Sequence, residues 1–451
     1  MIRHRFVSYA VVLPLVVICL AIGGAAAVAA ERGNLSVVTS YPSSFFEPFR
    51  LAFEARNPDI RVSIVQRNTA SASRFIMEKP QIAADIFWAS ATDAFELLKR
   101  KGELRPITRR ATGARSHVFG YPVDDPDGYY LGFALSGYGI VYNPAYLAQY
   151  HLPVPSNWQD LLKPVYSGHI GITSPSRSGT THLIVEVLLQ TYGWEKGWAM
   201  LSQLGGNLST VTARSFGVAS GVAQRRFGIG VTIDFLARSP GAAGAGNVFV
   251  LPPDAVYVPA SIGILSRARN VPAAERFVDF LLSEEGQRIL LHPAVDRIPV
   301  RAGLNDGLLP GSDHGSLLKS GGFDPQLSAE RYGLVNLIFD DYIVRRRATL
   351  ARLWRRLTEL EAMNFDAPDK LSALARARRL LATPPLSARE ASMLDEELKA
   401  EWPRGVARTA RQSRFARDLR STGEYNLATV ESLLLAVAAD TAREQLGGKL
   451  R

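Results

Sequence analysis

The stretch from Ser174 to Gly193, SPSRSGTTHLIVEVLLQTYG, has the pattern of a polar loop that leads into a helix. A short apolar run at 169–172 precedes it and is typical of a buried strand. A loop of hydroxyl side chains and glycine follows, and then the apolar spacing of a helix. The first-turn N–H groups of a helix lack partners within the helix, and the helix dipole places partial positive charge there. This order of elements predicts an anion site.

Four residues of this loop are candidate anion contacts. Ser178, Thr180 and Thr181 can donate hydroxyl hydrogen bonds, and Gly179 lets a ligand approach the backbone. The same hydroxyls suit a helix cap, in which Ser178 or Thr180 accepts a bond from the first turn. The sequence leaves both roles open.

Residues 1–30 have the pattern of a secretory signal. Arg3 and Arg5 precede a long apolar run, which ends in small residues at 27–30. This pattern predicts a cleaved signal peptide and a periplasmic protein, although the apolar run is nearly long enough for an uncleaved anchor. The only cysteine, Cys19, lies in this segment, so the mature chain is expected to contain no disulfide and no thiolate metal site.

Short apolar runs alternate with helical patterns between residues 35 and 101. Strands are predicted at 35–39, 61–65 and 85–89, and helices at 45–53, 69–78 and 94–101. This alternation predicts an α/β fold with a parallel sheet, in which ligands bind at the carboxyl ends of the strands. The candidate contacts at those ends are Ser40, Tyr41, Thr69 and Ser90.

A long extended run at 129–142, YYLGFALSGYGIVY, predicts a strand that crosses into a second lobe, with its glycines permitting a bend. Residues 257–265 are predicted to return to the first lobe, and a helix at 273–291 closes it. In the second lobe the apolar strand at 227–236 carries one acid, Asp234. Its carboxylate is either a ligand for a cationic group or a helix N-cap.

Five motifs in a fixed order carry a family resemblance: ADIFWASATDAFELLKRKGEL at 84–104, GYGIVYNPAYL at 137–147, SPSRSGTTH at 174–182, GIGVTIDFLA at 228–237 and ERFVDFLLSEEGQRIL at 275–290. Over residues 35–360 the chain resembles the extracellular solute-binding proteins of ABC importers, in the group of ferric-iron and phosphorylated-organic-anion carriers. Its segment 323–361 is most similar to the phosphoglycerate-transport regulatory branch. The resemblance implies a two-lobed type II periplasmic-binding-protein fold that closes on a ligand at a hinge and performs no catalysis.

We expect three units after the signal peptide. The first lobe comprises residues 31–134 and 257–361, with closing C-terminal helices, and the second lobe comprises 135–256. Residues 362–451 are predicted to form an all-helical extension. Most of the net charge of +10 lies in the last quarter of the chain, where arginines recur every three or four residues from Arg404 to Arg420. This row is either a membrane or partner-docking surface or a solvated helix face.

The resemblance implies a small-molecule ligand that is passed to an importer permease. Iron carriers in this group use adjacent tyrosines from the second lobe, but the only Tyr-Tyr pair here, Tyr129–Tyr130, precedes the crossover. We therefore expect a phosphorylated or phosphonate-bearing organic anion, also contacted by Arg214 and Ser215, without a metal or cofactor. A ferric-iron carrier is the lesser alternative, and a ligand-sensing co-receptor of a membrane sensor kinase is the alternative role.

The sequence contains none of the common catalytic motifs: HExxH, GxSxG, a Walker loop or CxxC. Its histidines are scattered without metal-ligand spacing. We therefore predict no enzymatic activity and no catalytic residue. Nucleic-acid binding is not expected of a secreted chain without a recognised binding motif.

Overall fold

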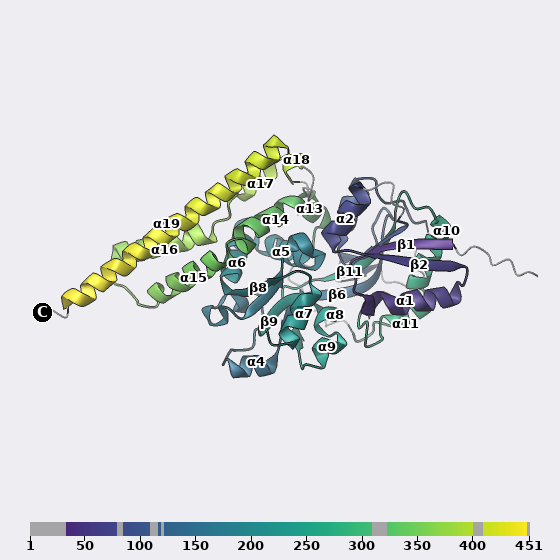
Figure 1. The fold of residues 1–451 in the computed structure, drawn as a ribbon, viewed down its shortest axis with the longest axis horizontal. Helices are drawn as coiled ribbons and strands as arrows, with labels where there is room; N and C mark the ends of the chain where they lie inside the picture. Colours follow the sequence, from purple (N-terminus) through teal and green to yellow (C-terminus); the bar gives the residue numbers. More distant parts are fainter. Residues whose placement is uncertain are drawn as a thin grey trace, which may run out of the picture.

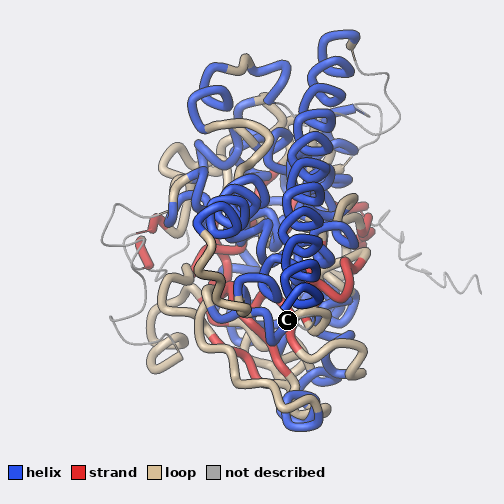
Figure 2. Tube along the Cα trace, turned by 90° about the vertical axis from the view of Figure 1, so that its left-hand side faces the viewer, coloured by secondary structure: helices blue, strands red, loops and turns tan. Residues whose placement is uncertain are grey.

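The computed structural model describes residues 33–78, 84–108, 116–118, 121–308, 323–399 and 409–448. The predicted signal peptide and Cys19 lie outside the described residues. One mixed sheet runs through the molecule in the strand order β2-β1-β3-β11-β6-β9-β7-β8, and β10 and β12 pair with β6. Helices cover the sheet, as Figures 1 and 2 show.

The first lobe contains three parallel strands, each followed by a helix. The strands are β1 (Gly33–Thr39), β2 (Ile60–Gln66) and β3 (Ile86–Ala89). The helices are α1 (Ser43–Arg56), α2 (Thr69–Glu78) and α3 (Thr92–Arg100). The predicted alternation of strands and helices is confirmed in this lobe. A small hairpin follows, made of β4 (His117–Val118) and β5 (Tyr121–Pro122).

The helix predicted over 273–291 is two helices, α10 (Val271–Leu282) and α11 (Glu284–Ile289). The break falls at Ser283, whose hydroxyl accepts a hydrogen bond from the Gly286 N–H at 3.2 Å. Ser283 thereby caps the N-terminus of α11, which satisfies a first-turn N–H and starts a new helix. The apolar spacing continues across this break, so it could not be read from periodicity alone.

Strand β6 (Leu131–Tyr142) joins the two halves of the sheet. Its first part pairs with β11 (Tyr257–Ile264), and residues 138–142 pair with β9 (Ile229–Ile233). Strand β11 in turn pairs with β3, and β12 (Ile298–Pro299) pairs with β6. The predicted crossing strand is therefore confirmed.

The glycines of β6 make room for neighbouring chain segments. None of the three has a positive φ. A Cβ atom on Gly132 would lie 2.4 Å from the carbonyl oxygen of Val123, and one on Gly139 would lie 2.3 Å from that of Val250. These glycines let neighbouring chain segments approach the strand.

The second lobe surrounds the other half of the sheet. Its strands are β7 (Ile170–Thr173), β8 (Leu208–Thr212), β9 and the short β10 (Val248–Val250). Its helices are α4 (Pro144–Gln149), α5 (Gly179–Tyr192), α6 (Trp194–Asn207), α7 (Phe216–Ala223), α8 (Asp234–Ala237) and α9 (Pro240–Ala243), with 3-10 turns at η1 (Asp160–Leu162), η2 (Pro164–Tyr166) and η3 (Pro175–Arg177). The strand predicted over 227–236 is shorter, because α8 begins at Asp234.

The C-terminal part is helical. It comprises α13 (Pro325–Glu330), α14 (Tyr332–Ile338), the π-helical turn η4 (Phe339–Val344), α15 (Arg347–Glu361), α16 (Pro368–Ala382), α17 (Ala388–Met393), α18 (Glu396–Lys399) and α19 (Ala410–Gly448). Four arginines of the row, from Arg411 to Arg420, lie in one 39-residue helix, α19, whereas Arg404 and Arg408 lie outside the described residues. Figure 1 shows this helix in yellow, lying along α16 and ending at the C-terminus.

An apolar seam holds the extension together. The buried positions of α19 recur every three or four residues at Ala416, Leu419, Gly423, Leu427, Val430, Leu434, Val437 and Thr441. This spacing places them on one face of the helix. From Leu427 onward the seam packs on an apolar stripe of α15. The stripe consists of five buried residues: Leu350, Leu353, Trp354, Leu357 and Leu360.

The segment expected to close the first lobe divides between the lobes. Helix α13 contacts α3 of the first lobe, whereas α14 contacts α5 and α15 packs on α6 of the second lobe. The indole Nε1 of Trp354 donates to the Ser202 hydroxyl at 3.3 Å. We predicted that the first lobe extends to residue 361. In the structure the amphipathic face of α15 is instead covered by α6 of the second lobe.

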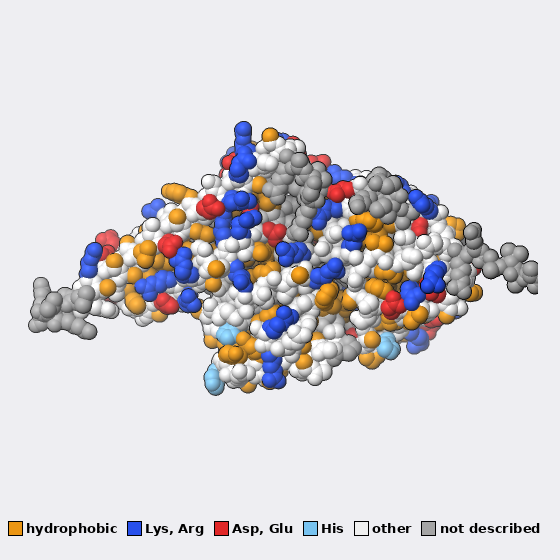
Figure 3. Space-filling model, viewed as in Figure 1, with side chains coloured by type: hydrophobic (Ala, Val, Ile, Leu, Met, Phe, Trp, Pro, Cys, Tyr) orange, Lys and Arg blue, Asp and Glu red, His pale blue; other side chains and the backbone are white. Residues whose placement is uncertain are grey.

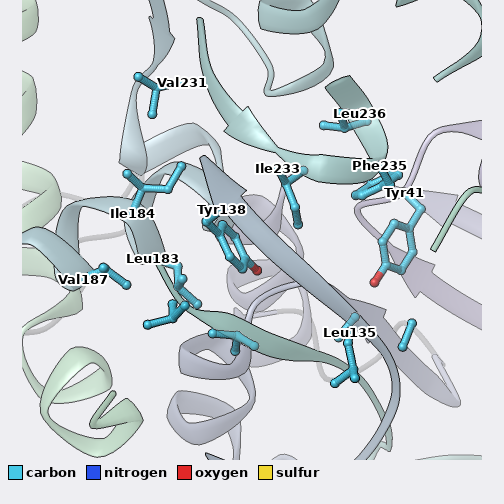
Figure 4. Packing of buried hydrophobic residues seen from close by; sticks show 14 of the residues in the cluster. Tyr41, Leu135, Tyr138, Leu183, Ile184, Val187, Val231, Ile233, Phe235 and Leu236 are labelled. Atoms are coloured by element: carbon cyan, nitrogen blue, oxygen red, sulfur yellow. The ribbon is translucent and has the colours of Figure 1, made fainter. Parts of the chain in front are cut away.

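The largest hydrophobic core runs from one lobe to the other across β6. Figure 4 shows part of it, with the rings of Tyr41 and Phe235 next to each other; their centroids are 6.3 Å apart. In the described part of the chain, no helix combines the length and apolar character needed to cross a membrane.

Candidate functional site

A cavity of about 30 Å³ lies between the two lobes. From the first lobe it is lined by Ser40, Tyr41, Pro42, Asn68, Thr69 and Ser90. From the second lobe it is lined by Arg177, Ser178, Gly179, Thr180, Arg214, Ser215, Phe216, Phe235 and Leu236. The structure therefore brings together all of the predicted contacts except Thr181 and Asp234.

The first-lobe wall is formed where strands end. Ser40 and Tyr41 follow β1, Ser90 follows β3 and Thr69 begins α2. The Tyr41 hydroxyl lies 2.8 Å from the Ser90 Oγ, and its ring stacks on Phe45 with centroids 4.1 Å apart. Burial raises the pKa of the Tyr41 phenol, although Arg297 opposes this shift. The phenol is therefore a neutral hydrogen-bonding group at neutral pH.

The second-lobe wall contains the N-terminus of α5. The Ser178 hydroxyl accepts a hydrogen bond from the Thr181 N–H at 3.2 Å, so Ser178 caps the helix and also lines the cavity. Thr180 is 8% exposed and lines the cavity, whereas Thr181 is buried and does not. The two roles that the sequence left open for Ser178 are thus compatible.

Gly179 is where the lobes touch. A Cβ atom at this position would lie 2.6 Å from the Ala91 Cβ and 3.0 Å from the Thr69 Oγ1 of the first lobe. Those distances are shorter than van der Waals contact, so only glycine fits this arrangement. Gly179 therefore permits the approach of the lobes as well as access to the backbone of the helix N-terminus.

The cavity lining is basic. Arg177 and Arg214 both line it, and none of the described residues that line it is Asp or Glu. The guanidinium of Arg214 lies 5.9 Å from the ring centroid of Phe216. Arg67, which precedes the lining residues Asn68 and Thr69, does not line the cavity itself; its guanidinium lies 4.3 Å from the Phe75 ring centroid.

Asp234, which the sequence left open as a ligand for a cationic group or a helix N-cap, does not line the cavity. It is 1% exposed, and its two carboxylate oxygens accept from the Gly137 N–H at 2.9 Å and from the Phe235 N–H at 2.7 Å. Arg238 lies 3.6 Å away and balances its charge in place of Arg214. Burial raises the pKa of Asp234, opposed first by Arg238. The carboxylate joins β6 to the start of α8.

His182 and Tyr130 also have structural roles. His182 is fully buried, and its ring nitrogens lie 2.9 Å from the Asn336 Oδ1 and 3.2 Å from the Ser328 Oγ. The Tyr130 hydroxyl donates to Glu96 at 2.5 Å, so the only Tyr-Tyr pair is not part of the cavity. Within the described residues, no cluster of three or more His, Asp or Glu side chains could hold a metal ion.

Arg297 was missed by the sequence reasoning. It is 2% exposed and donates to the Tyr41 hydroxyl at 2.9 Å, directly behind the cavity wall. A lone arginine in an irregular segment before β12 carries no periodic signal. Its position depends on the pairing of β12 with β6, which periodicity does not predict.

Comparisons with known proteins agree with this architecture. A family model described as bacterial extracellular solute-binding protein matches residues 82–326. The phosphoglycerate transport regulatory protein PgtC of Salmonella typhimurium is 36% identical over 276 residues, which cover 60% of this chain and 66% of that protein. The match thus spans just under two thirds of that relative.

Solved structures share the fold. The periplasmic binding protein AfuA from Actinobacillus pleuropneumoniae, with fructose-6-phosphate bound, superposes with a TM-score of 0.60 at 20% identity, covering 69% of this chain and 99% of AfuA. Iron-bound HitA from Pseudomonas aeruginosa superposes with a TM-score of 0.56 at 18% identity, covering 67% of this chain and 98% of HitA.

The two-lobed α/β fold of type II periplasmic binding proteins, with a helical C-terminal extension, is therefore confirmed. This fold and family are those of binding proteins, and they imply a small-molecule ligand and an ABC permease. Because the family model spans more than half of the sequence, this chain belongs to the bacterial extracellular solute-binding proteins.

Proposed function

We propose that this protein captures a small organic anion, phosphorylated or phosphonate-bearing, in the periplasm and delivers it to an ABC importer. The observation that carries the proposal is the cavity lining, which has two arginines, several hydroxyl groups and no carboxylate. Charge-assisted hydrogen bonds from such groups favour an anion. The names of two similar proteins, one linked to phosphoglycerate transport and one solved with fructose-6-phosphate, support a phosphorylated ligand.

The end of α5 is suited to the anionic group. Its first-turn N–H groups and dipole attract negative charge, and Thr180 adds a hydroxyl donor at the same place. Arg177 and Arg214 supply full positive charges from the same lobe. The first lobe contributes Ser40, Thr69 and Ser90, so a bound anion receives donors from both lobes and favours their closed arrangement.

Ferric iron is less well supported by the residues present. Fe(III) requires several anionic oxygen ligands, whereas Tyr41 is the only phenol in the lining and its pKa is raised by burial. Its hydroxyl also accepts a hydrogen bond from Arg297. The cavity therefore offers donors for an anion in place of anionic ligands for a hard cation.

The cavity volume implies motion. About 30 Å³ accommodates an anionic group or one or two waters, but not a whole sugar phosphate. Larger ligands therefore require the lobes to separate, with β6 and β11 serving as the hinge. Small-angle scattering of the mature protein with and without ligand tests this motion; identical radii of gyration at saturation would contradict it.

A thermal-shift screen tests the ligand class. The mature protein is screened against phosphorylated three-carbon acids, sugar phosphates, aminophosphonates and Fe(III). A ligand present at 100 times its Kd stabilises the fold by about 2.7 kcal/mol, which is readily detected. Stabilisation by Fe(III) alone would overturn the proposal.

A second candidate role is ligand sensing with a membrane kinase. Two observations favour it: the extension packs on α6 of the second lobe, where lobe motion would move it, and the relative PgtC is named a regulatory protein. Neighbouring genes distinguish the roles, since permease genes indicate import and genes for a sensor kinase and response regulator indicate signalling.

A further inference from the structure

Arg297 is a buried charge with an unusual environment. Its Nε donates to the Ser136 hydroxyl at 3.1 Å, Nη2 donates to the same oxygen, and Nη1 donates to the Tyr41 hydroxyl at 2.9 Å. Four ring centroids lie 4.4 to 5.8 Å from its guanidinium carbon, those of Tyr41, Phe45, Phe133 and Phe235. Among the described residues, no carboxylate forms an ion pair with it. Burying a charge without such a partner is costly, which points to a role in function.

The arginine fixes the direction of the hydrogen bonds that lead to the cavity. Arginine only donates, so the Tyr41 oxygen accepts from Arg297. The hydrogen of Tyr41 then has one partner in the described structure, the Ser90 Oγ at 2.8 Å. Because Tyr41 is 2% exposed, any other direction would leave its buried hydroxyl hydrogen unpaired. Tyr41 therefore donates to Ser90.

The direction of these bonds determines which group Ser90, a lining residue of the cavity, offers to a ligand. Its oxygen already accepts from Tyr41, and no other hydrogen bond of its side chain is present among the described residues. Its own hydrogen is therefore directed at the ligand. The bond from Tyr41 occupies one of the two lone pairs of this oxygen, so the hydroxyl hydrogen of Ser90 is free to donate to a ligand.

We propose that Arg297 is a positioning residue that polarises the chain Arg297–Tyr41–Ser90, so that Ser90 presents its hydrogen to the cavity and favours a ligand group that accepts hydrogen bonds. Ionised phosphoryl, phosphonate and carboxylate oxygens meet this requirement, whereas an ammonium group does not. The inference rests on the proposed function only in taking the cavity as the ligand site. It assigns this preference for an acceptor to a residue that does not line the cavity.

The polarity can be read without any ligand. Neutron diffraction from crystals of the deuterated, unliganded mature protein locates the hydroxyl deuterons. We expect the Tyr41 deuteron on the line to the Ser90 Oγ, and the Ser90 deuteron directed into the cavity. A deuteron on Ser90 that points at Tyr41 would overturn the inference, whatever ligand the protein binds.

Calorimetric titration of 3-phosphoglycerate tests the functional consequence. Ser90→Ala removes a donor to a charged group and should raise Kd about 10- to 150-fold. Tyr41→Phe should raise Kd by a smaller factor in the wild-type background and leave it unchanged in the Ser90→Ala background, because Tyr41 acts through Ser90. Independent, multiplicative effects of the two substitutions would overturn the chain.

Tyr138→Phe is the matched control. Tyr138 is also a buried tyrosine whose phenol feels the charge of Arg297, but it is outside the chain. Its substitution should leave Kd unchanged while the melting temperatures of the variants report any loss of stability. If the wild-type protein binds no phosphorylated acid, the proposed function fails, and the neutron result still decides the polarity.

Discussion

The two lobes and the helical extension use their buried side chains differently. Between the lobes the structure buries charged groups, including Arg297, Asp234 and Asp93. The extension, made of α15, α16 and α19, has a hydrophobic core, and most of its ion pairs are exposed. Figure 3 shows Lys and Arg interspersed with Asp and Glu over this part of the surface. The contrast indicates that the extension is built for stability, whereas the lobes give part of their buried surface to binding and motion.

The largest effect is expected in the seam of the extension. Leu357 of α15 is fully buried, so Leu357→Ala should lower the free energy of unfolding by about 2–5 kcal/mol in chemical denaturation. Leu435→Ala, at a position 64% exposed on α19, is the control and should change it by less than about 0.5 kcal/mol. Ligand affinity should not change in either variant. A loss of affinity in Leu357→Ala would show that the extension takes part in lobe closure.

Asp93 should give the lobe boundary its own pH dependence. It is fully buried on α3, and burial raises its pKa to about 6. Two residues of α5 face it: His182, at 3.4 Å, and Glu186, which is paired with Arg331. A raised pKa favours the protonated form in the folded state. The stabilisation is therefore complete below about pH 4 and is lost as pH rises to about 6, by up to about 3 kcal/mol.

Chemical denaturation between pH 4 and 6.5 measures this loss. Asp93→Asn should abolish the Asp93 contribution to the decrease in the free energy of unfolding. Asp59→Asn should retain that contribution, because Asp59 is exposed and Arg276 holds its pKa low. Equal pH profiles in wild type and Asp93→Asn would show that Asp93 does not control this dependence.

The anion loop should respond in affinity more than in stability. Thr180→Val removes a hydroxyl from the cavity lining and should weaken binding of a phosphorylated acid by about 1.5–3 kcal/mol, measured by calorimetry. The melting temperature of the unliganded protein should stay nearly constant. Unchanged affinity with a lowered melting temperature would reduce the loop to a helix cap.

Closure itself is tested at Gly179. The methyl group of Gly179→Ala would overlap Ala91 and Thr69 of the first lobe in the closed arrangement, so Kd should rise about 10- to 100-fold. Gly241→Ala, where a Cβ atom meets nothing within 4 Å, is the matched control. Scattering should show the Gly179→Ala variant remaining open with ligand present. Normal closure would mean that the lobes adjust to the methyl group.

The sequence predicted most of the residues that line the cavity, but not the buried groups that hold them in place. Ser40 and Ser90 could be found because parallel strands place their carboxyl ends at one edge of a sheet. Arg297 could not, since it lies 256 residues from its partner Tyr41 and is placed by long-range pairing. The sequence indicated that Asp234 is a buried acid. Its orientation depends on the backbone of β6, whose position cannot be predicted from the local sequence pattern.

The same distinction holds for the helices. The apolar residues of α15 recur in the sequence with a period close to 3.6 residues, and the structure buries them. The sequence did not show that α6 of the second lobe covers this stripe, because periodicity indicates which face of a helix is buried but not which element packs on it. The 39-residue length of α19 is not evident from the sequence, because the arginines of its first half conceal a sparse apolar repeat.

The smallest effect is expected for the exposed ion pair between α15 and α19. Arg352 and Glu431 lie 2.5 Å apart with side chains 50% and 41% exposed. Water and salt screen such a pair, so a double-mutant cycle with Arg352→Ala and Glu431→Ala should give a coupling energy of about 0–1 kcal/mol that falls further at 1 M salt. A coupling above about 2 kcal/mol, insensitive to salt, would show that charge also holds the extension, and the contrast with the lobes would no longer stand.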